Sequence, residues 1–102
     1  MESGYRVAWT DHALDELNQT FQYLELNFSE KEIDYLAKTI ESVLRNTSQH
    51  PKLYPESTQR AEVRRAVVTK HNTLYYRINK RHSRIEILSF FMNRESPDNL
   101  SI

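Results

Sequence analysis

Two apolar stripes with helical spacing, separated by the three residues Asn27-Phe28-Ser29, restrict the fold of this chain more than any other feature. A break this short predicts two helices that fold back on each other as a hairpin. Thr10, followed by Asp11, suits the start of the first helix, and Ser29 with Glu32 has the spacing of a capping box. The first stripe is Leu14, Leu17, Phe21 and Leu24, and the second is Ile33, Leu36, Ala37, Ile40, Val43 and Leu44. Each helix has one apolar face, so each needs a second layer to cover it.

Strand-like runs flank this helical pair on both sides. Residues 5–9 alternate and precede the first helix, whereas residues 47–59 contain two prolines and predict a surface loop. Three further runs follow, at 62–68, 73–79 and 84–92. In the second of these runs, Leu74, Tyr76 and Ile78 share one face, and Tyr75 and Arg77 share the other. The order is β-α-α-β-β-β, which predicts an α+β domain with an antiparallel sheet packed against an N-terminal helical hairpin.

The last run predicts where the sheet is most deeply buried. It is apolar on both faces, with Ile85, Ile87 and Phe91 on one and Leu88 and Phe90 on the other, as is typical of a strand inside a sheet. Gly4 is the only glycine, so Asn72 and Asn79 are the expected positive-φ residues in the turns. We expect residues 1–102 to form a single domain whose polar segment 95–102 trails from it.

Composition excludes several classes of protein. The chain has no cysteine, and its four histidines show no ligand spacing, so we expect neither a metal nor a cofactor. No apolar run is long enough for a membrane span or a signal peptide, so we expect a cytoplasmic bacterial protein. The zero net charge hides an asymmetry. Residues 1–59 hold ten acidic and five basic side chains, and residues 60–102 hold four acidic and nine basic ones. Such a basic half indicates either a nucleic-acid or acidic partner, or solvated strand edges at which Lys and Arg prevent pairing with other chains.

An ordered set of motifs covers nearly the whole chain. An aromatic strand ends at Trp9 and is followed by Ala13 and Leu17, and the second helix leads to a loop with Pro51 and Pro55. The most specific stretch comprises Val63-Arg64-Arg65, Lys70 to Ile78, Ile85-Glu86-Ile87-Leu88, Phe91-Met92-Asn93-Arg94 and Pro97. This set resembles the RelE/ParE superfamily of bacterial toxins, in the branch known as plasmid stabilisation proteins. Met92 departs from the pattern, because this branch often has an acidic residue there.

The resemblance implies the toxin of a type II toxin–antitoxin module that arrests growth. RelE-like members cleave mRNA on the ribosome, and ParE-like members poison DNA gyrase; the fold does not choose between them. A third alternative is a degenerate or solitary member of the RelE/ParE fold that only binds another protein and is not toxic. The toxin readings imply an antitoxin that covers apolar grooves and presents acidic residues to the basic strands. The oligomeric state stays open.

A RelE-like reaction needs groups that move protons and a group that stabilises charge on the phosphate. Arginine suits the second role, and alternation allows only Arg64 or Arg65 to share a face with Arg77; the resemblance favours Arg64. For the nuclease, the predicted catalytic residues are Arg64, Arg77, Tyr75, His71 and Lys70. The predicted nucleic-acid or partner contacts are Arg64, Arg65, Lys70, Arg77 and Arg94. Some such nucleases carry a Tyr or His near the C-terminus, and this chain has neither after Arg94.

Overall fold

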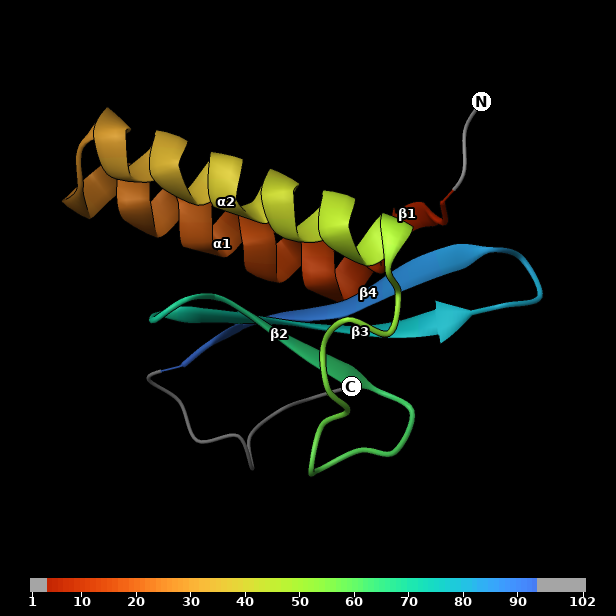
Figure 1. The fold of residues 1–102 in the computed structure, drawn as a ribbon. Helices are drawn as coiled ribbons and strands as arrows, with labels where there is room; N and C mark the ends of the chain where they lie inside the picture. Colours follow the sequence, from red (N-terminus) through yellow and green to blue (C-terminus); the bar gives the residue numbers. More distant parts are fainter. Residues whose placement is uncertain (1–3, 94–102) are drawn as a thin grey trace.

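The computed structural model describes residues 4–93 and has two layers, a helical hairpin lying on one face of a four-stranded sheet (Figure 1). The elements are β1 (Arg6–Trp9), α1 (Asp11–Asn27), α2 (Glu30–Gln49), β2 (Arg64–Thr69), β3 (Asn72–Asn79) and β4 (Arg84–Met92). The α+β class and the order of elements match the sequence prediction. Arg94 and the predicted tail at 95–102 lie outside the described residues.

The sheet has the strand order β1-β4-β3-β2. The strands β2, β3 and β4 form the predicted antiparallel meander, and β1 joins it in parallel beside β4. The sheet is therefore mixed. The helical hairpin returns the chain to the end of the sheet at which β1 begins, so β2 runs in the same direction as β1. Two turns of the meander later, β4 again has this direction and pairs with β1 in parallel. The strand β4 is internal, as its apolar faces predicted.

The helices begin where the sequence predicted. Thr10 caps α1 by accepting a hydrogen bond from the backbone N–H of Ala13 at 3.1 Å. The Glu32 carboxylate closes the capping box of α2 by accepting the backbone N–H of Ser29 at 3.1 Å. The second helix extends further than predicted, through Gln49, and in its last turns Thr47 is buried with its hydroxyl bonded to backbone carbonyls of the helix. Between them the helices bury a main core against the sheet, which contains Ala13, Leu36, Ile40, Val43, Ala66, Val68, Leu74, Tyr76, Ile85, Ile87 and Phe90.

A second, smaller cluster lies on the other face of the sheet, which we call the outer face. It consists of Val63, Tyr75 and Phe91, with Leu88 packed against them. The prediction had placed Phe91 with Ile85 and Ile87, and this assignment is wrong. The β3–β4 register shifts between Tyr75 and Tyr76, so β4 holds one extra residue there. The resulting bulge exchanges the faces of Phe90 and Phe91.

The positive-φ residues also differ from the prediction. Among residues 4–93 they are Gly4, Glu62 and Ser83, with φ of 52° at Ser83, and neither Asn72 nor Asn79 is one of them. Asn79 serves the β3–β4 turn through its side chain instead, which accepts the backbone N–H of His82 at 3.1 Å. Within the same residues, neither helix is both long and apolar enough to cross a lipid bilayer.

Candidate binding surfaces

Arg64 and Arg77 occupy opposite faces of the sheet, contrary to the expectation that they share a site. Arg64 lies on the same side of β2 as the buried residues Ala66 and Val68, which face the helices. Its Nη1 donates to the backbone carbonyl of Tyr54 at 2.7 Å, so the side chain holds the loop before β2. Alternation places Arg65 on the outer face, and that side chain is exposed. Arg65, not Arg64, therefore shares a face with Arg77.

The two adjacent tyrosines of β3 are both buried. Tyr75 is 2% exposed and packs edge-on against the ring of Phe91, with 6.1 Å between ring centroids. Tyr76 lies in the main core, where its hydroxyl donates to the carbonyl of Pro51 at 2.7 Å. Burial raises the pKa of Tyr76 to about 12. Both side chains therefore contribute packing, the outcome that the alternation pattern favoured for Tyr76.

Lys70 and His71 form the exposed two-residue turn between β2 and β3. Asn93 holds this turn, because its side-chain amide donates to the Lys70 carbonyl at 3.0 Å and its backbone N–H donates to the His71 carbonyl at 2.9 Å. From Asn72 to Arg77 the strand rises roughly 16 Å at about 3.3 Å per residue. The five predicted catalytic residues are thus divided among two faces and two ends of the sheet.

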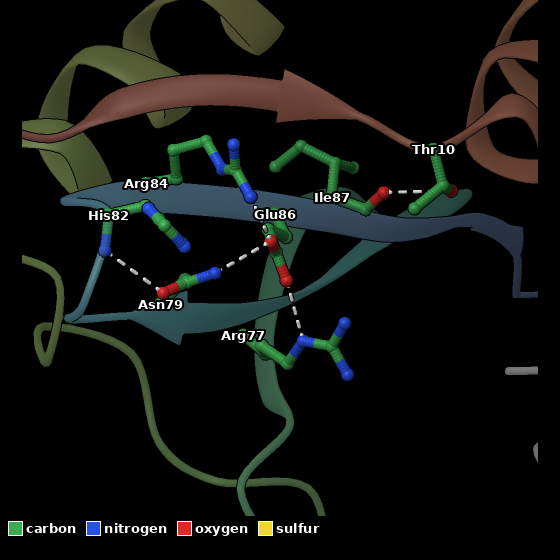
Figure 2. Close-up of polar contacts among 7 residues, drawn as sticks. All are labelled: Thr10, Arg77, Asn79, His82, Arg84, Glu86 and Ile87. Carbon is green, nitrogen blue, oxygen red and sulfur yellow. Dashed lines mark hydrogen bonds and ion pairs between the residues drawn. The ribbon is translucent and has the colours of Figure 1, made fainter.

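Arg77 belongs to a polar cluster on the outer face (Figure 2). Its Nε donates to one carboxylate oxygen of Glu86 at 2.7 Å, while Asn79 and Arg84 donate to the other oxygen at 3.1 and 3.2 Å. These hydrogen bonds, chiefly that from Asn79 and then that from Arg77, lower the pKa of Glu86 to about 2. Glu86 is therefore ionised at neutral pH and holds the Arg77 side chain through Nε, and Figure 2 draws no contact between it and either terminal nitrogen.

A shallow hollow of about 400 Å³ lies beside this cluster, and we call it the arginine hollow. Its lining residues are Thr10, His12, Arg60, Ala61, Val63, Arg77 and Leu88. The sequence predicted no functional role for His12 or Arg60. No local pattern marks either residue, because the N-terminus of α1, the loop before β2 and the strand β3 meet only in the folded chain.

A larger, mainly apolar groove of about 560 Å³ lies between the tip of the helical hairpin and the β2–β3 turn. Leu24, Phe28, Tyr35 and Met92 contribute apolar surface, and Lys70 and His71 stand at its rim. Phe28 and Tyr35 are 48% and 64% exposed, although both are aromatic. Their positions outside the two helical stripes were the available sequence signal for this surface, which we call the apolar groove.

Comparison with known families assigns the fold. The sequence model described as "ParE toxin of type II toxin-antitoxin system, parDE" matches residues 7–97. The chain belongs to this ParE toxin family. The resemblance to the RelE/ParE superfamily is therefore confirmed, and the protein is the toxin of a type II toxin–antitoxin system. No curated protein matches the chain.

Solved structures share the fold of this ParE-family toxin at low sequence identity. The chromosomal ParDE toxin–antitoxin system from P. aeruginosa superposes with a TM-score of 0.71 at 13% identity, over 86% of this chain and 95% of that chain. The YoeB/ParE toxin from Agrobacterium tumefaciens gives 0.64 at 15%, over 85% and 96%. The RelBE2 toxin–antitoxin complex from Mycobacterium tuberculosis gives 0.61 at 20%, over 87% and 98%. At these identities the likenesses establish the fold and do not identify the target.

Proposed function

We propose that this ParE-family toxin arrests growth by binding DNA gyrase and that it does not cleave mRNA. The observation that carries this proposal is the separation of the predicted catalytic residues. Arg64 is engaged with the loop at Tyr54, Tyr75 is buried, and Lys70 and His71 lie at the far end of β3 from Arg77. General acid–base catalysis needs its groups within hydrogen-bond reach of one reacting phosphate. This separation of the predicted catalytic residues supports a toxin that acts by binding its target through a surface.

The decisive experiment measures both activities on one refolded preparation. We expect the toxin to block supercoiling of relaxed plasmid by purified gyrase and to leave message intact in a cell-free translation mix, as read by primer extension. Codon-phased cuts in the message would overturn the proposal in favour of the RelE-like nuclease. Unimpeded supercoiling at high toxin excess, without growth arrest on expression, would instead indicate the solitary protein-binding module.

We further propose that the partner of this toxin is a cognate antitoxin and that the apolar groove is the antitoxin-binding site. Two of the structural relatives, the ParDE system and the RelBE2 complex, are toxin–antitoxin assemblies. The groove here offers exposed Phe28 and Tyr35 with Lys70 at the rim, which suits an amphipathic segment carrying apolar anchors and an acidic residue. Basic and acidic groups that meet at an interface rim mainly set orientation and association rate.

Polar substitutions in the groove test whether it is the antitoxin-binding site. Phe28→Ser and Tyr35→Ser should weaken antitoxin binding by roughly tenfold or more each, because aromatic anchors often contribute above 1 kcal/mol. Leu53→Ser is the matched control, since Leu53 is 55% exposed and lies outside the groove. Growth arrest that the antitoxin no longer relieves in the groove variants, but still relieves in the control, would support the assignment. Equal neutralisation of all three would contradict it.

A further inference from the structure

We propose that the arginine hollow binds the phosphate backbone of duplex DNA. The inference deepens the proposed function, on which it rests: a toxin that engages gyrase would there contact the DNA that the enzyme holds. The hollow brings Arg60 and Arg77 together on the outer face, beside His12, whose Nε2 lies 3.4 Å from the Glu16 carboxylate. The residues that line the hollow themselves include no carboxylate. Phosphate oxygens are the ligands that guanidinium groups match most closely.

The geometry of Arg77 carries the proposal furthest. Its Nε donates to Glu86 at 2.7 Å, and Figure 2 draws no contact between either terminal nitrogen and that carboxylate. A guanidinium held in this way keeps the four N–H donors of its two terminal nitrogens for a second anion, and its fixed orientation reduces the entropy that binding would cost. Glu86 does not cancel this charge, because it is shared with Arg84, which donates to it at 3.2 Å. The pair of arginines therefore keeps one positive charge in excess.

The surroundings of the hollow extend the same chemistry. Arg65 is an exposed outer-face residue opposite Tyr75 in the register, which makes it a diagonal neighbour of Arg77 at roughly 7–8 Å. Thr10, the N-cap of α1, lines the hollow, so the positive end of that helix dipole lies at its wall. The hollow is shallow and broad, which suits a polymer backbone passing over the surface better than an enclosed small molecule. Backbone contacts of this kind carry no sequence information.

Direct titration of labelled duplex DNA tests the inference without gyrase. We would measure fluorescence anisotropy of a 20-base-pair duplex with wild-type toxin, Arg77→Gln, Arg60→Gln and Arg81→Gln, at salt concentrations from roughly 0.05 to 0.2 M. Arg81 is the matched control, because it is exposed in the β3–β4 turn and its loss removes the same charge. Thermal unfolding of each variant checks that the fold is retained.

The expected result is a loss of DNA affinity of about fivefold or more for Arg77→Gln and Arg60→Gln. Each should also reduce the salt slope by about one relative to wild type, the change expected for one lost phosphate contact. A loss of less than about twofold is expected for Arg81→Gln. Equal losses in all three variants, or binding to single-stranded RNA as tight as to duplex DNA, would overturn the assignment. If the toxin blocked gyrase without binding DNA through these arginines, this inference would fail and the proposed function would stand. Cleavage of mRNA by the toxin would contradict the proposed function itself.

Discussion

The carboxylate of Glu16, on α1, accepts a hydrogen bond from the hydroxyl of Ser89 on β4 at 2.7 Å. The same oxygen accepts the backbone N–H of Phe90 at 2.9 Å. Ser89 is fully buried and lies beside the bulge of β4. A bulge disrupts the ladder locally, and a buried N–H without a partner is costly. Glu16 thus supplies from the helix an acceptor for a buried hydroxyl and for a backbone N–H beside the bulge.

Glu16→Ala should lower the free energy of unfolding by about 1–3 kcal/mol, because it leaves the Ser89 hydroxyl and the Phe90 N–H without their acceptor. Chemical denaturation at neutral pH measures the change. Glu25→Ala is the matched control, since it removes the same charge from an exposed position of α1 and should change stability by less than about 0.5 kcal/mol. Equal effects of the two substitutions would show that charge alone matters.

The bulge also shows why the sequence predicted the strands but not every face of them. The apolar runs predicted β3 and β4 within one residue of their observed bounds. The exchange of Phe90 and Phe91 was not predictable by alternation, because one extra residue in a strand leaves its composition unchanged. The Glu16 carboxylate that accepts hydrogen bonds next to the bulge belongs to α1, far away along the chain.

The candidate site was harder to predict than the fold, for the same physical reason. Period-2 alternation correctly separated Arg64 from Arg65, but it could not tell which of them faces the helices. That choice depends on the packing of Ala66 and Val68 under α2. The residues His12, Arg60 and Arg77 of the arginine hollow come from three separate parts of the chain, so no local motif contains them together.

The Thr10 hydroxyl links the first helix to the sheet, because it both accepts and donates a hydrogen bond. Its Oγ1 accepts the Ala13 N–H at 3.1 Å and donates to the Ile87 carbonyl at 3.0 Å. Thr10→Val, which keeps the shape and removes the hydroxyl, should lower the free energy of unfolding by about 1–2 kcal/mol. Urea denaturation of Thr10→Val and Thr10→Ser tests this, because serine keeps the hydroxyl and should recover most of the loss. Equal stabilities of the two variants would contradict a hydrogen-bonding role.

Glu86 should make the free energy of unfolding depend on pH in the acidic range. Its folded-state pKa, about 2, lies below the ordinary value of 4.5, so its contribution is fully present above about pH 4.5 and is lost as the pH falls toward 2. Glu86→Gln should lower the free energy of unfolding at pH 7 by about 1–2 kcal/mol, a figure reduced for solvent screening because the Arg77 side chain is 54% exposed. Denaturation at several pH values should give a flatter acid limb for the variant. Parallel curves for the two proteins would show that Glu86 contributes no pH dependence.

Tyr76 should act at the opposite end of the pH scale. Burial raises its pKa from 10.0 to about 12. Below pH 10 the hydroxyl is protonated in both states. Between pH 10 and 12 the unfolded chain ionises first, so stability is lost as the pH rises through this window.

Tyr76→Phe removes the hydrogen bond to the Pro51 carbonyl and should cost about 1 kcal/mol at pH 8. From pH 10 to 12 the wild-type protein should lose roughly 2–3 kcal/mol more than the variant, because only the wild type carries this ionising group. Chemical denaturation across that range therefore gives stability curves that converge and then cross. A constant gap between them would mean that the Tyr76 hydroxyl ionises as readily in the folded chain as in the unfolded one.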